Sequence, residues 1–202
     1  MIVEAVRRSP LADYALRFAE LSAARPGDLF LREHPFLAQV NLRTDPNDPA
    51  VMQRLASSLG FALPVAANTT AATEDRRALW LGPDEWLIVG PQNQEGALEQ
   101  AMRDGLAGAF GSIVDVSASR TVLEIRGVEA RDLLLHGVPI DLDTRSFKIG
   151  RCAQTLLGKA QLIIERRGDE AAFHLYVRSS FAYYVADWLL DAAANPNLKS
   201  AR

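Results

Sequence analysis

Two successive stretches of this 202-residue chain show the same order of apolar patterns: a strand, a helix, a pair of strands and a second helix. Alternating apolar residues predict strands, and apolar residues three or four positions apart predict helices. The order favours an α+β fold in which helices pack on mixed or antiparallel sheets. We expect one domain over residues 1–202, with pseudo-repeated halves at about 28–110 and 111–194 and a flexible tail at 195–202. No residue-level repeat accompanies this order, so duplication is a hypothesis from element order alone.

Three helices are expected in the first half of the chain. Ser9-Pro10 opens an amphipathic helix that continues to Leu21, because proline suits the first turn of a helix. Asp48-Pro49 begins a second helix, which Gly60 ends as a left-handed residue. The third runs from Asn93 to Phe110, with its apolar side chains, Phe110 included, on one face, and Gly111 ends it.

Extended segments and one loop separate these helices. The apolar side chains of residues 36–42 fall on one side of an extended chain, which predicts a half-buried strand. Residues 78–89 predict a hairpin that turns at Gly82-Pro83-Asp84-Glu85, with proline at the first corner. Residues 63–77 are rich in Ala, Thr and Asn without an apolar period, so we expect an exposed and mobile loop there.

The second half contains most of the predicted strands. They lie at 113–116, 121–126, 152–157, 160–165 and 173–177, with a helix at 128–136. Ser179 or Ser180 is expected to cap the last helix. The wide apolar stripe of that helix comprises Phe181, Tyr184, Val185, Trp188 and Leu189.

Composition excludes several classes of protein. A formal charge of −3 and a pI near 5.7 argue against a nucleic-acid binder, which needs a concentrated basic face. The pairs Arg7-Arg8 and Arg166-Arg167 are interpreted as solvated surface. No apolar run is long enough to cross a membrane, and the N-terminal sequence lacks the apolar core of a signal peptide. The single cysteine, Cys152, excludes an internal disulfide and suits the reducing cytoplasm.

The three histidines do not form a nucleophilic triad in the sequence. His136 directly precedes Gly137 and is explained as a residue that favours the end of a helix. His174 alternates with apolar neighbours in a strand and is interpreted as a side chain on the surface of a sheet. His34 precedes a proline in an extended segment, where nothing marks it as catalytic.

Other chemistry is weakly supported. One cysteine and the absence of HxH or HExxH spacing exclude a recognisable zinc site. The glycines of residues 105–111 end a helix, whereas a nucleotide fingerprint would open one.

Cys152 follows Lys148 and Gly150 at the spacing of a redox or folate-linked motif, but its position at the start of an apolar strand favours a buried, inert thiol. Asp115 and Asp141 are a weak signal for acid–base catalysis. The sequence therefore predicts no catalytic, cofactor-binding or metal-binding residue on this chain.

Several separated segments give the chain a family resemblance. They are Arg8-Ser9-Pro10-Leu11, the stretch from Glu33 to Arg43, Leu81-Gly82-Pro83-Asp84-Glu85-Trp86-Leu87, and the region from Val114 to Leu190, which contains Cys152-Ala153-Gln154-Thr155. In this order they resemble the gamma subunit of heterotetrameric sarcosine oxidase over most of the chain. The resemblance implies a fold similar to the folate-binding domain of the aminomethyltransferases.

The same resemblance implies a non-catalytic subunit in a complex that oxidatively demethylates sarcosine. The product is glycine, with hydrogen peroxide formed and a methylene group transferred to tetrahydrofolate. FAD, FMN, NAD, tetrahydrofolate and zinc are then expected on the partner subunits, with no cofactor on this chain. The expected partners are the alpha, beta and delta subunits, chiefly alpha.

Two alternatives remain open at this point. The first is a free-standing folate-binding protein of the same superfamily that assists iron–sulfur protein maturation. Its signature of Lys-Gly-Cys-Tyr followed by Gly-Gln-Glu is interrupted here by Ile149 and Arg151, and Ala153 replaces the tyrosine. The second is the equivalent subunit of an oxidase for another N-methylated or cyclic amino acid.

Overall fold

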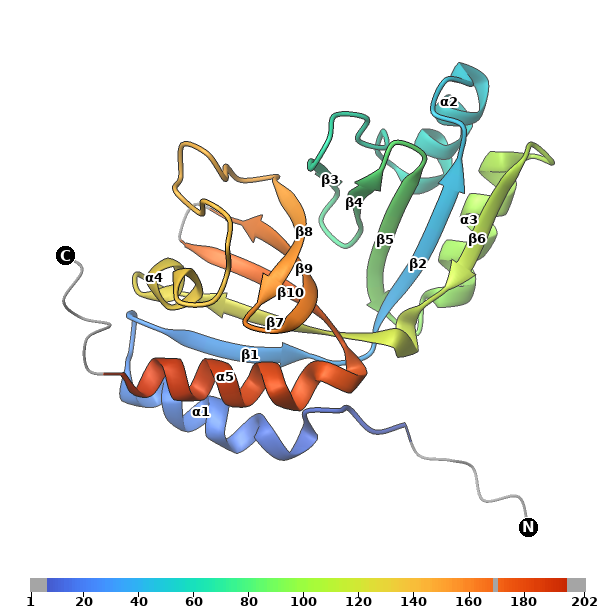
Figure 1. Ribbon diagram of the computed structural model, residues 1–202. Coiled ribbons are helices and arrows are strands. Elements are labelled where there is room, and N and C mark those ends of the chain that lie inside the picture. Colours follow the sequence, from blue (N-terminus) through green and yellow to red (C-terminus); the bar gives the residue numbers. More distant parts are fainter. Residues whose placement is uncertain (1–6, 169–170, 196–202) are drawn as a thin grey trace, which may run out of the picture.

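The computed structural model describes residues 7–168 and 171–195, whose strands form two five-stranded sheets (Figure 1). The first sheet has the order β1-β7-β10-β9-β8, and the second has the order β3-β4-β5-β2-β6. All ladders between neighbouring strands of these two sheets are antiparallel. The α+β prediction is confirmed, and the sheets are of the antiparallel kind.

The elements have the following bounds. The strands are β1 (Phe30–His34), β2 (Leu37–Thr44), β3 (Thr70–Ala72), β4 (Arg77–Gly82), β5 (Glu85–Gln92), β6 (Gly111–Asp115), β7 (Arg120–Arg126), β8 (Cys152–Leu157), β9 (Ala160–Arg167) and β10 (Ala172–Arg178). The helices are α1 (Ala15–Ala24), α2 (Pro49–Leu59), α3 (Glu95–Leu106), α4 (Ala130–Leu135) and α5 (Ala182–Ala194). Among the described residues, none of these helices is long and apolar enough to cross a membrane.

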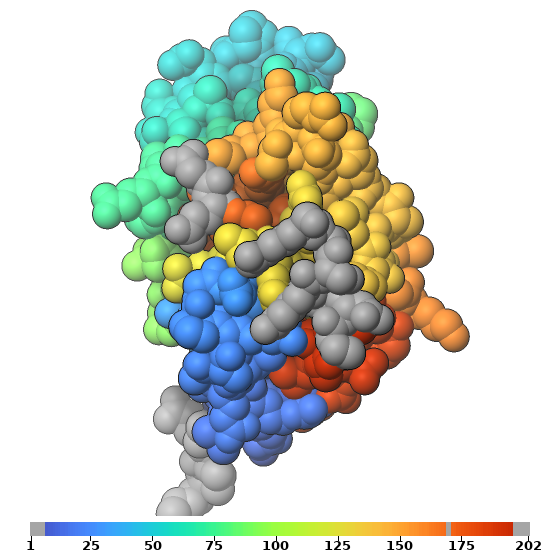
Figure 2. Space-filling model, turned by 90° about the vertical axis from the view of Figure 1, so that its left-hand side faces the viewer, coloured from blue at the N-terminus to red at the C-terminus, as the bar shows by residue number. Residues whose placement is uncertain are grey.

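The elements stack in four layers. Helices α1, α4 and α5 cover the outer face of the first sheet, and α2 and α3 cover the outer face of the second (Figure 1). Figure 2 looks onto the end of the molecule where α1, in blue, and α5, in red, lie side by side. Just before α1 begins, the Tyr14 hydroxyl donates a hydrogen bond of 2.8 Å to Asp187 of α5. The inner faces of the two sheets pack on each other through Leu79, Leu87, Val89, Val122, Cys152, Ile163 and Tyr176.

The two sheets are connected along one pair of edges. Thr69 and Arg151 form an isolated antiparallel bridge. On either side of it the Thr70 amide donates to the Gly150 carbonyl at 2.8 Å, and the Cys152 amide donates to the Asn68 carbonyl at 3.0 Å. Backbone hydrogen bonds therefore fix the position of β8 relative to β3.

Local sequence signals explain the parts that were predicted well. The Asp48 carboxylate accepts hydrogen bonds from the amides of Ala50 and Val51, which caps α2, and Gly60 ends that helix at φ 87°. The predicted hairpin is present as β4 and β5, and it pairs Trp80 with Trp86. In the second half, β8 has the predicted bounds and α4 is shorter at both ends.

The segment before α2 is more complex than predicted. Residues 30–44 form two strands, β1 and β2, in different sheets, because Phe36 adopts a φ of 61° in the turn that separates them. Phe36 is therefore not part of the predicted strand. Ala38, Val40 and Leu42 are buried on the outer face of the second sheet, as their alternation indicated.

The prediction of an exposed loop at residues 63–77 is wrong in part. Leu63 is buried, β3 lies within the segment, and Arg77 is a buried residue at the start of β4. Pairing with β4 and with the turn at Gly150 orders a sequence that has no apolar period of its own.

The predicted helix ends also need correction. Helix α3 stops at Leu106, because Ala107 and Gly108 take left-handed φ angles of 48° and 84°. Gly111 begins β6, and Phe110 is 95% exposed instead of lying on the apolar face of a helix. Helix α1 begins at Ala15, after a 3₁₀ turn, and not at Pro10.

The start of the last helix also differs from the prediction. Neither serine caps α5, because residues 179–181 form a 3₁₀ turn and the Ser179 hydroxyl donates to the Ala118 carbonyl at 3.0 Å. Val185 and Leu189 of the predicted stripe are buried, whereas Phe181 and Tyr184 are exposed. The division into two pseudo-repeated halves stays a prediction, and residues 196–202 of the predicted tail lie outside the described residues.

Candidate functional site

Ionisable side chains converge between the two sheets. Directly opposite residues of antiparallel strands point to the same face, and the register aligns Glu124, His174 and Glu165 across β7, β10 and β9 on the inner face. We call the full set the intersheet cluster. Its members are His34, Arg77, Glu124, Glu165, Arg167, His174 and Tyr176.

Glu165 joins the two sheets within this cluster. One of its carboxylate oxygens accepts a hydrogen bond from Arg77 of β4 at 3.1 Å, and the other accepts one from the Tyr176 hydroxyl at 2.7 Å. The side chains of Arg77 and Glu165 are only 9% and 3% exposed. Burial and the adjacent Glu165 charge raise the pKa of Tyr176 well above its ordinary value. Tyr176 therefore acts as a neutral hydrogen-bond donor.

His34 and Glu124 form the second pair of the cluster. The His34 Nε2 lies 2.7 Å from a carboxylate oxygen of Glu124. This hydrogen bond is the main reason that the pKa of Glu124 is lowered, so Glu124 is a carboxylate at neutral pH. Arg126 lies on the other side, with its Nε 3.5 Å from the second oxygen.

His174 lies beside this pair, in a positive environment. Its ring centroid is 5.3 Å from that of His34, and the Arg167 Nη1 lies 3.4 and 3.5 Å from its two ring nitrogens. Burial and then the charge of Arg167 lower the pKa of His174 to about 3, although Glu124 opposes the shift. His174 is therefore a neutral imidazole across the physiological range. It is also buried, so the prediction of a sheet-surface side chain is wrong.

The three residues His34, Glu124 and His174 present metal-ligand atoms within 4.8 Å of one another. Two imidazoles and a carboxylate are a ligand set that zinc uses. A cation at this position would, however, have to separate His34 from Glu124 and displace the Arg167 guanidinium from His174. Two further guanidinium groups, those of Arg77 and Arg126, act on the same cluster. The charges around the three residues thus fit an internal network better than a divalent cation.

The pKa of His174 predicts an acid-dependent loss of stability. The unfolded chain binds a proton at His174 near pH 6.5 and the folded chain does so only near pH 3, so stability is complete above pH 6.5 and falls as the pH falls. From pH 7 to pH 5 the free energy of unfolding should drop by about 2 kcal/mol from this residue. Urea denaturation at a series of pH values measures the slope.

His174→Phe should flatten that slope, and the exposed His136→Gln variant should retain it. Glu124 contributes only below this range, because its pKa is lowered from an already acidic value. An unchanged slope in His174→Phe would contradict the assignment.

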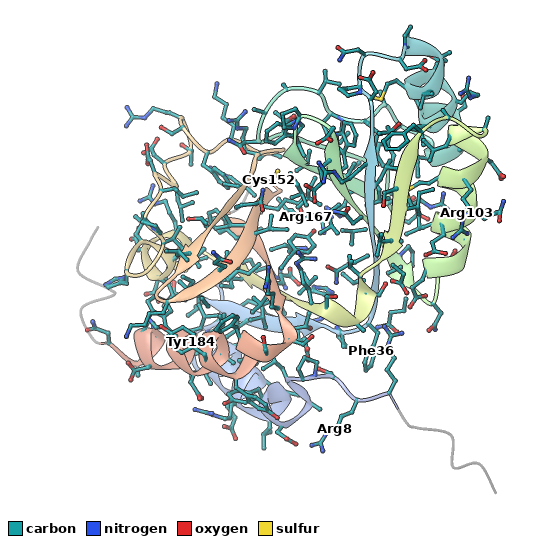
Figure 3. The ribbon with its side chains drawn as sticks, turned by 45° about the vertical axis from the view of Figure 1, so that its right-hand side comes forward. Arg8, Phe36, Arg103, Cys152, Arg167 and Tyr184 are labelled. Atoms are coloured by element: carbon teal, nitrogen blue, oxygen red, sulfur yellow. The ribbon has the colours of Figure 1, made fainter. Side chains whose placement is uncertain are left out.

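Cys152 lies at the end of the same cross-strand row, opposite Glu165 (Figure 3). It is fully buried, and burial raises the pKa of the thiol to about 12. The Sγ atom lies 3.5 Å from the carbonyl oxygens of Thr69 and Trp80. The prediction of a buried cysteine is confirmed, and at neutral pH the group is a thiol. Lys148 and Gly150 lie in the turn that leads into β8.

The other predicted candidates do not join the cluster. His136 lies at the C-cap of α4, where its Nδ1 is 2.7 Å from the Asp132 carbonyl. Asp115 ends β6 and accepts hydrogen bonds from Ser117, whereas Asp141 lies in the loop between α4 and β8 and accepts one from the Asp143 amide. The two carboxylates therefore lie in different parts of the fold, Asp115 in the second sheet and Asp141 in a loop. Residues 105–111 span the end of α3 and the start of β6.

The interpretation of Arg166-Arg167 as a solvated pair is wrong. Arg166 is buried and donates to the Phe147 carbonyl at 2.9 Å, and Arg167 contacts His174. Arg7 and Arg8 do lie at the surface, where they pair with Glu95 and Asp13.

Sequence reasoning did not find Glu124, Glu165 and Arg77. Glu124 lies between apolar residues in a strand, a pattern that is typical of a sheet with one wet face, whereas Glu165 and Arg77 stand beside other charged residues at a strand end, which is typical of exposed positions. Because both faces of these sheets are covered, the polar positions point into the interface. The sequence offers no signal that would bring Glu124, Glu165 and His174 together, because their alignment depends on the register of β7, β10 and β9.

Comparison with known proteins gives consistent matches. The chain matches the model of the sarcosine oxidase, gamma subunit family over residues 43–195. It is 35% identical to sarcosine oxidase subunit gamma of an Arthrobacter species over 93% of this chain and 90% of that protein, and the same values apply to the subunit from Corynebacterium sp. strain P-1.

Solved structures agree with this result. A chain of the heterotetrameric sarcosine oxidase from Corynebacterium sp. U-96 matches with a TM-score of 0.85 and 32% identity, covering 93% of this chain and 95% of that one. Aminomethyltransferase T from Bartonella henselae matches with a TM-score of 0.64 at 14% identity, over 85% of this chain and 48% of that one, which shows a shared fold. On the strength of the matched residues and the coverage in both directions, the chain belongs to the sarcosine oxidase gamma subunit family.

Proposed function

We propose that this chain is a non-catalytic gamma subunit of a heterotetrameric sarcosine oxidase. The observation that carries the proposal is the match to the Corynebacterium oxidase, which covers nearly the whole length of both chains at 32% identity. The match covers 93% of this chain and 95% of the chain in that assembly.

The chemistry of the intersheet cluster supports a structural role. Glu165 binds Arg77 and Tyr176, and Glu124 binds His34, so these carboxylates are engaged inside the protein. A protonated thiol at Cys152 is a poor nucleophile, and a neutral buried His174 beside Arg167 is a poor base. The cluster joins the sheets and leaves the reaction to other subunits.

The complex would oxidatively demethylate sarcosine to glycine in the cytoplasm. It would form hydrogen peroxide and transfer the methylene group to tetrahydrofolate. We assign FAD, FMN, NAD, tetrahydrofolate and zinc to the partner subunits, and we place this chain chiefly against alpha, with beta and delta in the same assembly. An oxidase for another N-methylated or cyclic amino acid would place its substrate pocket on a partner as well.

The edge of the second sheet at β6 supports a contact with a partner. Four of its five residues are exposed, and β6 is an edge strand with β2 as its neighbour in the sheet. Phe110 precedes it with 95% of its surface exposed, and Val114 within it is 48% exposed. An exposed aromatic ring next to an unpaired strand edge is a feature that proteins usually cover.

Replacing Phe110 by Asp is therefore expected to weaken assembly. A buried aromatic anchor of an interface typically contributes about 2 kcal/mol or more, which corresponds to about a thirtyfold loss of affinity. The measurement is the amount of large subunit retained by a tagged chain. Leu16→Asp on α1 is the matched control, because Leu16 is an exposed apolar residue at the opposite part of the fold. Loss in the control with full retention in Phe110→Asp would move the contact to α1.

Co-purification from the native cell tests the function itself. A tagged chain should retain larger, yellow flavin-bearing subunits and show peroxide production that depends on sarcosine. A colourless chain that is recovered alone and binds tetrahydrofolate would instead favour the free-standing folate-binding protein. A purified single chain that oxidises sarcosine would contradict the non-catalytic assignment.

A further inference from the structure

Two arginines lie opposite each other at the open end of the intersheet space. Arg120 begins β7 and Arg178 ends β10, and the register pairs them directly (Figure 1 shows these strand ends beside the entry to α5). Their alternation with Val122 and Tyr176 places both side chains on the inner face of the first sheet. Like charges directly opposite on neighbouring strands destabilise a sheet, so this pairing has a cost.

No acidic group of the described chain compensates for that cost by direct contact. Among the described residues, neither guanidinium makes a hydrogen bond or an ion pair within 4.0 Å. The charge of Glu85 raises the pKa of Arg120 without a hydrogen bond between the two groups, and the Glu85 carboxylate accepts a hydrogen bond from Asn41 at 2.8 Å. By contrast, the arginines of the intersheet cluster each have a partner. Burial, and after it the charge of Arg178, lower the pKa of Arg120, and Glu85 only partly opposes the shift.

The two arginines line a cavity of about 360 Å³. Gln161 of β9 and Gln154 of β8 also line it, and the Gln154 amide donates to the Leu81 carbonyl at 2.8 Å. The rest of the wall includes the apolar side chains of Leu156 and Ile163. The lining of this cavity contains no carboxylate. The cavity is thus lined by two cationic groups, by neutral polar side chains that include Gln154 and Tyr176, and by apolar side chains.

We propose that Arg120 and Arg178 form a binding site for an organic carboxylate. Guanidinium groups bind carboxylate oxygens in a two-pronged geometry, and a pair of them on adjacent strands can hold one carboxylate between them. The apolar part of the ligand would lie against Leu156 and Ile163. The carboxylate is that of a free small molecule or that of an acidic side chain of a partner subunit.

Binding of benzoate to the purified full chain tests the site, with benzamide as the neutral molecule of the same shape and inorganic phosphate as a second anion. Calorimetric titration at constant ionic strength should show saturable binding of benzoate and none of benzamide. Arg178→Gln should weaken benzoate binding by about tenfold or more, since hydrogen bonds to charged groups contribute about 1.5–3 kcal/mol. Arg103→Gln, which alters an exposed arginine of α3, should bind as the unchanged chain does.

Arg178→Gln should also fold at least as well as the unchanged chain without ligand, because the substitution removes a repulsion at an exposed position. Thermal unfolding at low salt measures the stability of this variant. A clear loss of stability would show that Arg178 makes a stabilising contact in the unchanged chain, which contradicts the absence of a partner among the described residues. The proposal would be overturned if Arg178→Gln and Arg103→Gln bind benzoate equally well. Binding of phosphate but not of benzoate, or no saturable binding at all, would also overturn it.

The assembled complex separates the two sources of the carboxylate. A free ligand leaves the cavity open, so benzoate should bind the complex as well as the single chain. A partner side chain fills the cavity, so benzoate should bind the single chain only and Arg178→Gln should weaken assembly. Either result supports the carboxylate site.

Discussion

Replacing Glu165 by Ala is expected to lower the free energy of unfolding by about 3–5 kcal/mol, because it leaves a buried guanidinium without its partner. Arg77 is 9% exposed and donates to Glu165 from the opposite sheet. The substitution also removes the acceptor of the Tyr176 hydroxyl, which is fully buried. Urea denaturation followed by the fluorescence of the buried Trp86 measures the loss.

Two comparisons make the Glu165 result specific. Glu99→Ala removes one partner of the exposed Glu99–Arg103 pair on α3 and should cost less than about 0.5 kcal/mol. The double variant Arg77→Leu with Glu165→Leu removes both charges, so it should recover a large part of the single loss. If the double variant is less stable than Glu165→Ala, the Arg77–Glu165 ion pair stabilises the packing of the two sheets beyond the neutralisation of two buried charges.

Replacing Gly127 by Ala is expected to cost about 2–4 kcal/mol, since two independent penalties coincide there. Gly127 has a φ of +116°, which residues with a side chain rarely adopt. A β-carbon would also lie 2.4 Å from the carbonyl oxygen of Asp28 and 2.7 Å from its carbonyl carbon. These are backbone atoms, and the same oxygen accepts a hydrogen bond from the Glu129 amide at 2.9 Å. The clash therefore cannot be relieved without loosening the start of α4.

Gly27 provides the matched control, because it separates the two penalties. Its φ is +81°, but a β-carbon there would have no atom within 4 Å. Gly27→Ala should therefore cost only about 1 kcal/mol, from backbone conformation alone. Equal losses in the two variants, measured by thermal unfolding, would show that the contact with Asp28 relaxes freely.

The sequence was sufficient where local chemistry determines the structure. Asp48-Pro49 and Gly60 delimit α2 because a cap and a left-handed glycine act within one turn of the helix. The hairpin at Gly82 has a turn signal between two apolar runs, and the second half has short, mostly apolar segments, so the existence of these strands could also be predicted. The end of α3 was predicted too late, because Gly111 was interpreted as the residue that ends it, whereas the left-handed Ala107 and Gly108 end the helix and Gly111 pairs with Thr44.

The candidate site depended on information that a single strand does not contain. Glu124, Glu165 and His174 lie in one row only because β7, β9 and β10 are neighbours in a particular register. Whether that row faces solvent depends on the second sheet, which begins more than 80 residues earlier at β2. His174 and Arg167 were assigned to the surface for this reason. Cys152 was placed correctly because an apolar strand start indicates burial without knowledge of its partners.

The second sheet is built from consecutive strands, β2 to β6, whereas the first sheet combines the early strand β1 with β7 to β10, and this order limits how the protein can be made. β1 pairs with β7 although β2 follows it directly, and β6 pairs with β2 although β7 follows it directly. During synthesis on the ribosome, residues 30–34 must wait for residues 122–126 before they can pair. The second sheet, by contrast, can pair all of its strands once residue 115 has emerged. The chain can therefore complete the second sheet before the first, while β1 lacks its partner until β7 has been translated.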